Sequence, residues 1–266
     1  MRIRPVLLGT AIVIALLLGA LYAGQRAMMY FPTRMSQDEA IRAATAVGAI
    51  PWRAGDGGLR GWRLAQSPTR PRATVLILHG NAGWALDRIH YARSLVPLGC
   101  DVVLLEYPGY GARPGQPSLG ALTAAAVEAV DALAHEGGPV WLLGESLGSG
   151  VVGRVVAARL SAVRGLLFVT PFADIGTVAR RHYPFLPAWF VRDRFRPAQD
   201  VAAFTGPAIV LIAGHDEVVG AEEGRELFAA LHGPKRLVEQ PAATHNGMDL
   251  SSPAFWAEAV QFLDRN

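Results

Sequence analysis

Ser146 stands between two glycines in "LLGESLGSG" (142–150), which has the spacing G-x-S-x-G. The apolar run "PVWLLG" (139–144) precedes it, and "SGVVGRVVAARL" (149–160), with small residues at helical spacing, follows it. A serine becomes an exposed nucleophile on a sharp turn from strand to helix, and flanking glycines let the two elements approach closely. An ordinary turn of small residues would have the same pattern. A nucleophilic Ser146 therefore requires a base, an acid and an oxyanion site elsewhere in the chain.

His245, in "PAATHNGMDL", is the predicted base, because a serine hydroxyl is barely ionised at neutral pH without one. It lies between the last predicted strand and the last predicted helix, among small and polar residues typical of an exposed loop. The other six histidines are expected to be structural, to lie on the surface or to belong to an aromatic-rich segment: His79, His90, His135, His182, His215 and His232.

Asp216, in "LIAGHDEVVG", is the predicted acid, which must hold the base in the correct tautomer and stabilise its protonated form. It follows a predicted strand, and the order Ser, Asp, His along the chain is typical of one hydrolase architecture. Glu217 is adjacent, and Asp174 is a rival because it also follows a predicted strand. Either aspartate could instead be a helix N-cap or a turn residue.

Two backbone N–H groups are predicted to bind the oxyanion that forms during acyl transfer. The N–H of Leu147 directly follows the serine. The second donor is expected in "HGNAG" (79–83), which follows the apolar strand "ATVLILHG" (73–80). Asn81 is the predicted donor, with Ala82 as its neighbour.

Apolar strands alternate with helical segments from about residue 46 onward, which predicts an α/β fold with a mostly parallel central sheet and helices on both faces. Ligands bind such sheets at the carboxyl ends of the strands, where Ser146 is expected. The predicted strands are 59–64, 73–80, 101–111, 139–144, 165–171, 206–217 and 235–241. The predicted helices are 84–99, 118–138, 149–160, 221–233 and 252–266.

Composition excludes several kinds of site. The single cysteine, Cys100, rules out an internal disulfide and a multi-cysteine metal site. The net charge of +3 comes with no basic helix interleaved with aromatic residues, so no nucleic-acid partner is expected. No cofactor or metal is expected either.

The N-terminus predicts a membrane anchor. "MRIRPVLLGTAIVIALLLGALYAGQR" is uncharged from Pro5 to Gln25, close to the roughly 20 residues that span a bilayer as a helix. A cleaved signal peptide is the alternative, although "ALYAGQ" has no A-x-A cleavage pattern. Arg2 and Arg4 favour a cytoplasmic N-terminus, with the remaining chain outside the cytoplasm. The predicted organisation is an anchor at 1–26, a juxtamembrane linker at 27–45 and a catalytic domain at 46–266.

A segment at about 172–205 is expected to form a small cap over the site. Its part "RRHYPFLPAWFVRDRFRP" (180–197) is rich in arginine, proline and aromatic residues. The aromatic residues are expected either to line a pocket or touch lipid, or to form a small hydrophobic cluster under a loop: Tyr183, Phe185, Trp189, Phe190 and Phe195. The arginines are candidates for contacting anionic headgroups: Arg180, Arg181, Arg192, Arg194 and Arg196.

The motifs "HGNAG", "EYPGYG", "GESLGSG", "GHDEVV" and "THN", in this order, resemble those of the α/β-hydrolase superfamily over residues 46–266. "MMYFP" directly after the apolar span resembles the membrane-anchored Bem-type serine hydrolases, whose members include protein depalmitoylases. The resemblance implies Ser146 as nucleophile, Asp216 as acid, His245 as base, and Asn81 and Leu147 as oxyanion donors.

The predicted function is that of a membrane-anchored serine hydrolase, which cleaves carboxylic esters or thioesters of a small or lipid-like acyl substrate through an acyl-enzyme. A serine peptidase of the same fold is one alternative. A non-catalytic binding or scaffold protein that kept the hydrolase fold is another, because fold alone does not give function.

Overall fold

A computed structural model describes residues 3–64 and 71–266. Within them, a mixed sheet has the strand order β10-β9-β8-β7-β4-β6-β3-β2. β3 pairs antiparallel with β2 and β6, and the remaining pairs are parallel. The strands are β2 (Ile50–Arg53), β3 (Leu59–Leu64), β4 (Thr74–Leu78), β6 (Asp101–Leu105), β7 (Val140–Glu145), β8 (Val163–Val169), β9 (Ala208–Ala213) and β10 (Lys235–Gln240).

Helices cover both faces of the sheet, as the near-continuous apolar sequences of its central strands require. One hydrophobic cluster joins the sheet to α4 (Leu119–Glu136), α5 (Leu147–Arg159), α6 (Ile175–His182) and α8 (Ala221–Ala230). A second cluster joins the opposite face to α2 (Gln37–Ala46), α3 (Ile89–Leu95) and α9 (Pro253–Arg265). The predicted α/β fold, with its mostly parallel sheet, is confirmed.

The predicted helix at 84–99 is broken into three short pieces. A 3-10 turn, η1 (Ala85–Arg88), leads into α3, and a second one, η2 (Val96–Leu98), follows it. Pro97 lacks the backbone N–H that would continue the helical hydrogen bonds. Gly99 then adopts a left-handed conformation with φ of 87°, which ends the segment.

Residues 27–45, predicted to be a linker, are folded against the domain. β1 (Phe31–Pro32) pairs in parallel with β5 (Ala82–Gly83). α2 then begins at Ser36, whose side chain forms a capping box with Glu39. The motif S-x-x-E in "SQDE" is the sequence signal for this helix start. The helix packs against the sheet through the small buried residues Ala40 and Ala44.

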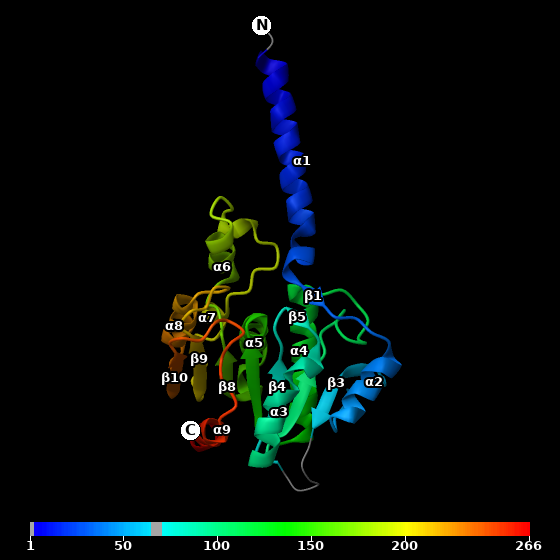
Figure 1. Cartoon of the computed structure of the whole chain (residues 1–266), viewed down its shortest axis with the longest axis vertical. Coiled ribbons are helices and arrows are strands. Elements are labelled where there is room, and N and C mark those ends of the chain that lie inside the picture. Colours follow the sequence, from blue (N-terminus) through cyan, green and yellow to red (C-terminus); the bar gives the residue numbers. More distant parts are fainter. Residues whose placement is uncertain (1–2, 65–70) are drawn as a thin grey trace.

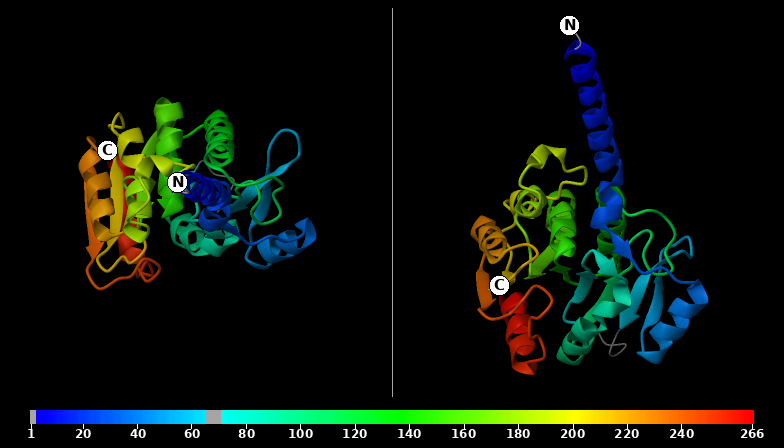
Figure 2. Two further views of the ribbon diagram at one scale, coloured as in Figure 1. Left: turned by 90° about the horizontal axis from the view of Figure 1, so that it is seen from above. Right: turned by 45° about the horizontal axis from the view of Figure 1, so that its top comes forward.

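α1 (Ile3–Met29) projects away from the domain, as Figures 1 and 2 show. Its Leu7–Met29 part is long and apolar enough to cross a membrane. Leu8, Leu16 and Leu17 are each more than 60% exposed, because no other part of the described chain covers them. An isolated apolar helix of this length is unfavourable in water and suits a bilayer.

Candidate active site

Ser146 lies on a tight turn between β7 and α5. Its backbone has φ 49° and ψ −115°, a conformation that is strained for a residue with a side chain. Gly148 makes the turn possible, because a Cβ there would overlap the Leu78 carbonyl of the neighbouring strand β4. A Cβ on Gly144 would meet Val152 and the Gly148 backbone. The glycines of G-x-S-x-G thus let the strand and the helix approach closely around the serine.

Three side chains from separate loops meet at this turn. The Ser146 hydroxyl lies 3.0 Å from Nε2 of His245, and Nδ1 of His245 lies 2.8 Å from Oδ2 of Asp216. A carboxylate can only accept, so Nδ1 carries the proton and Nε2 is free to accept the serine proton. The predicted serine, base and acid are brought together in an arrangement that can activate the hydroxyl.

The Asp216 carboxylate is held rigidly. Its second oxygen accepts the backbone N–H groups of Val218 and Val219 at 3.0 and 2.8 Å. Burial alone would raise the pKa of Asp216, but His245 and these N–H groups lower it below its usual value. Asp216 therefore stays ionised beside His245. Glu217, the adjacent carboxylate, instead accepts the backbone N–H of His245.

Asp174, the rival acid, has other partners. Its carboxylate caps α6 by accepting the Gly176 N–H at 2.6 Å. It also accepts from Arg194, with Nη2 at 2.7 Å from Oδ2. Both contacts belong to the cap segment, so Asp174 is a capping and ion-pairing residue.

Both predicted oxyanion residues line the cavity that contains Ser146. Leu147 is the first residue of α5, where backbone N–H groups lack partners within the helix. Asn81 is held in place through both its backbone carbonyl and its side-chain amide. Its carbonyl accepts from Phe31 N–H at 2.8 Å and from the Tyr110 hydroxyl at 2.7 Å, and its side-chain amide donates to the Met29 carbonyl at 2.9 Å.

Glu145, directly before the serine, belongs to a partly buried polar cluster that the sequence did not reveal. Its carboxylate accepts from Arg88 Nε at 3.0 Å and from the Tyr91 hydroxyl at 2.8 Å. Burial opposes ionisation, but the Arg88 charge lowers the pKa of Glu145 below its usual value. Because any residue can occupy the position before the serine in G-x-S-x-G, the motif does not predict that Glu145 pairs with Arg88 and Tyr91.

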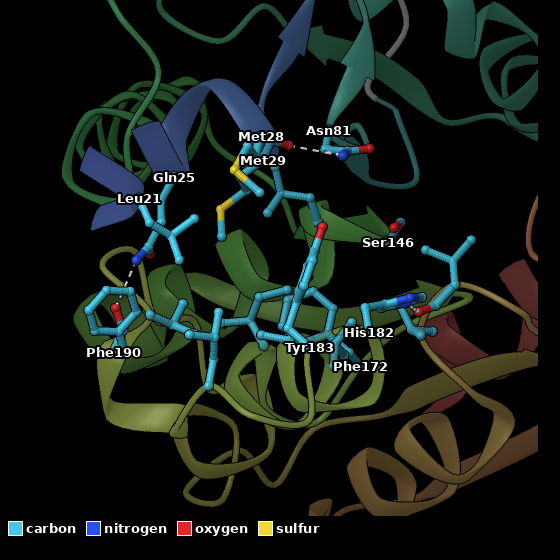
Figure 3. A pocket seen from close by; sticks show the side chains of 18 of the residues that line it. Leu21, Gln25, Met28, Met29, Asn81, Ser146, Phe172, His182, Tyr183 and Phe190 are labelled. Atoms are coloured by element: carbon cyan, nitrogen blue, oxygen red, sulfur yellow. Dashed lines mark hydrogen bonds between the residues drawn. The ribbon is translucent and has the colours of Figure 1, made fainter. Parts of the chain in front are cut away.

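A cavity of about 330 Å³ extends from Ser146 between the cap and α1 (Figure 3). Its lining is predominantly apolar, with Phe172, Val178 and Leu186 among the residues on the cap side. The polar side chains Gln25 and His182 also line it, but both are hydrogen-bonded to backbone groups of the protein. The cavity therefore suits an apolar group attached to the reacting carbonyl.

The cap consists of α6, a 3-10 turn η4 (Ala188–Phe190) and the short helix α7 (Pro197–Asp200). Its aromatic residues divide into three groups. Phe195 is buried against Gly150 of α5. Tyr183, Phe185 and Phe190 line the cavity. Trp189 is 77% exposed, and Phe185 is exposed to the same degree although it lines the cavity.

The cap arginines are largely engaged within the protein. Arg194 pairs with Asp174, and Arg181 pairs with Glu222. Arg192 lies over the Tyr22 ring at 5.7 Å, and Arg196 donates to Gln199. Arg180 is exposed, and contact of these arginines with anionic headgroups stays a prediction.

No group of three or more metal-ligating side chains occurs among the residues the structure describes.

Comparisons with known proteins identify hydrolase relatives. A family model described as "Serine aminopeptidase, S33" matches residues 69–197. The uncharacterized protein Rv2307c of Mycobacterium tuberculosis is 30% identical over 266 residues, which cover 98% of this chain and 94% of that protein. Lysophosphatidylserine lipase ABHD12 of Macaca fascicularis is 30% identical over 217 residues, covering 73% of this chain. The chain matches 54% of that lipase, about half its length.

Solved structures show the same fold. A monoacylglycerol lipase of Paleococcus ferrophilus has a TM-score of 0.57 at 20% identity, over 81% of this chain and 98% of that one. An esterase of Pyrococcus furiosus has a TM-score of 0.64 at 18% identity, over 89% of this chain and 97% of that one. Together with the sheet order and the strand–turn–helix setting of Ser146, these relatives show that the chain belongs to the α/β-hydrolase superfamily.

Proposed function

We propose that this protein is a membrane-anchored serine hydrolase that cleaves carboxylic esters or thioesters of lipid-like acyl groups. The observation that carries the proposal is the hydrogen-bonded series Ser146–His245–Asp216 at the mouth of an apolar cavity. The esterase and lipase activities named for similar proteins support it. The narrower resemblance to Bem-type hydrolases stays a prediction.

In the proposed reaction, Ser146 Oγ attacks the carbonyl carbon while its proton passes to His245 Nε2. The developing oxyanion accepts hydrogen bonds from the backbone N–H groups of Leu147 and Asn81. The intermediate collapses when His245 returns the proton to the leaving oxygen or sulfur, which leaves an acyl ester on Ser146. Water, deprotonated by His245, then attacks this ester and releases the free acid and the serine.

The two sides of the site differ in polarity, which supports an amphiphilic substrate. The acyl side is the apolar cavity beside Ser146. A second cavity, of about 190 Å³, adjoins His245 and is lined by polar residues that include Arg88, Thr170 and Asn246. Because His245 protonates the leaving group, a polar leaving group fits this side.

The N-terminal helix supports the proposed membrane location. Its exposed leucines need an apolar environment, and the exposed Phe185 and Trp189 suit the bilayer surface, where aromatic side chains gather. With Arg2 and Arg4 before the span, we propose that the catalytic domain lies outside the cytoplasm.

The test is labelling by a fluorophosphonate probe followed by ester hydrolysis. Ser146→Ala should abolish labelling and lower kcat on the order of 10⁴-fold or more, because the triad acts as a unit. Ser161→Ala, at an exposed position beyond the end of α5, is the matched control and should keep labelling. Equal labelling of wild type and Ser146→Ala would refute a Ser146 nucleophile.

An aminopeptidase is the second candidate, favoured by the description of the matching family model. Such an enzyme needs to bind a substrate ammonium group, and buried ammonium groups require a carboxylate partner. Among the described residues that line the larger cavity, none is acidic. We therefore expect acyl esters to be hydrolysed faster than aminoacyl anilides.

A further inference from the structure

The last turns of α1 form one wall of the cavity that contains Ser146. Leu21, Gln25 and Met28 line it, together with Met29. Their spacing, i, i+4 and i+7, places these residues on one face of the helix. Figure 3 shows them across the cavity from Phe172 and Tyr183. The anchor thus contributes side chains to the pocket as well as attaching the domain to a membrane.

The cap is bound to this part of α1 by specific contacts. The Gln25 side chain donates to the Phe190 carbonyl at 2.9 Å and accepts from the Arg192 N–H at 2.8 Å. Tyr22 and Phe190 form an edge-to-face ring pair with centroids 5.6 Å apart. Because both ends of the Gln25 amide are engaged, this wall offers the pocket an apolar surface.

The wall extends along α1 toward the part of the helix that no described residue covers. From Met28 to Leu21 the helix rises about 10 Å, at about 1.5 Å per residue. Leu17, one turn beyond Leu21, is 65% exposed. The far end of the pocket therefore lies beside the apolar helix surface that would face lipid.

We propose that α1 is an acyl-binding element of this enzyme: the substrate's chain lies along its Leu21–Met28 face and enters the pocket directly from the bilayer. Met28 and Leu21 then determine which chain lengths fit. This inference rests on the proposed hydrolase function, and it assigns the acyl group to a single long chain of a membrane-dissolved ester.

The experiment measures kcat/KM of the full-length protein for C4 to C16 acyl esters, in phosphatidylcholine vesicles. Each buried methylene contributes about 4-fold to binding, so a Met28→Trp side chain that displaces two or three methylenes should lower kcat/KM for long chains by roughly 15- to 60-fold. The loss should grow with chain length and be smallest for the C4 ester, whose chain is too short to fill the Leu21–Met28 face. Leu21→Trp, farther from Ser146, should spare intermediate chains and affect only the longest.

Ala27→Trp and Leu16→Trp are the matched controls, because they add the same ring on the opposite face of α1. Both should keep the wild-type profile. If Met28→Trp loses labelling altogether, Met28→Ala tests the role of Met28 instead. Its larger pocket should shift the preferred acyl chain to greater length. Identical chain-length profiles for wild type, Met28→Ala and the labelled tryptophan variants would overturn the inference. Failure of wild type to label or to hydrolyse any ester would instead refute the proposed function.

Discussion

Single residues in this protein owe their proposed roles to partners that are distant in sequence. Asp216 and Asp174 both follow a strand of the sheet, so their sequence settings are alike. Asp216 faces His245 across 2.8 Å, whereas Asp174 faces Arg194 across 2.7 Å. The loop that meets each aspartate, and not its place after a strand, thus distinguishes the proposed catalytic acid Asp216 from Asp174.

Asp216→Asn should lower kcat on the order of 10⁴-fold while the fold is retained, because an amide favours the wrong tautomer of His245. Asp174→Asn should keep most activity, since it changes only the contacts with Arg194 and the start of α6. The measurement is kcat for a short-chain ester, with circular dichroism to verify folding. A large loss in Asp174→Asn with an active Asp216→Asn would reverse the assignment.

His79 gives the protein a predictable sensitivity to acid. Its Nδ1–H donates to the Gly80 carbonyl, and its Nε2 is buried without a partner among the described residues. Burial, assisted by the Arg88 charge, lowers the pKa of His79 to about 3. In the unfolded chain it is about 6.5. The neutral form therefore stabilises the fold fully above pH 6.5, and this contribution is lost as the pH falls toward 3.

By pH 5 this linkage should cost about 2 kcal/mol of unfolding free energy. His79→Phe, which keeps a ring between Tyr107 and Tyr110, should remove that loss. The measurement is the difference in denaturant unfolding free energy between pH 7.5 and pH 5. His135→Gln, at an exposed position on α4, should keep the wild-type difference. If His79→Phe shows the same difference in unfolding free energy between pH 7.5 and pH 5 as wild type, other groups cause the loss of stability in acid.

At the scale of elements, the cap is attached to the anchor through a buried carboxylate. Asp193 is 5% exposed and accepts from Arg26 Nε and Nη2 at 2.9 and 3.0 Å. The Tyr30 hydroxyl donates to the same carboxylate at 2.9 Å. The paired, bidentate geometry fixes the cap relative to α1 and so sets the width of the cavity between them.

Asp193→Asn should loosen the cap, because the charge-assisted pair with Arg26 is lost inside the protein. We expect chymotryptic cleavage at Trp189 or Phe190 to accelerate about 10-fold, in line with a loss of somewhat over 1 kcal/mol in local opening. Glu222→Gln is the control: it removes an exposed pair with Arg181, and such pairs contribute little. Equal cleavage rates in wild type and Asp193→Asn would show that the cap is held by other contacts.

At the scale of the whole molecule, α1 connects a proposed bilayer location to the reaction site. The β1–β5 pairing and the Asn81–Met29 hydrogen bond join the end of α1 to the loop that carries a proposed oxyanion donor. The end of α1 and the backbone around Ser146 are therefore mechanically connected in this fold.

Full-length protein should resist carbonate extraction from membranes, because the apolar length of α1 matches a bilayer. A chain that begins at Gln25 should remain in the supernatant, since it lacks most of the exposed apolar helix. A mature N-terminus near residue 24, found by mass spectrometry, would instead show that the segment is a cleaved signal.

The sequence by itself determined the alternation of strands and helices, the α/β-hydrolase fold and the residues of the candidate site. These follow from local patterns: apolar periodicity, the glycines around Ser146, and motifs after strand ends. Because the sheet is parallel, its carboxyl ends meet, and the order of motifs predicts which side chains share a site.

Only the tertiary structure decided how residues 27–45 and the cap are used. Residues 27–45 were predicted to be a linker, but they form the strand β1 and the helix α2, because β1 pairs with β5 about fifty residues further along the chain. Arg181 and Arg194 of the cap pair with acidic residues of the protein, and the anchor's Leu21 and Met28 line the cavity. The hydrogen bonds of Gln25 and Arg26 to the cap join residues 165 to 167 positions apart in the sequence. No local periodicity encodes which surfaces meet over such distances, so packing of the whole chain decides it.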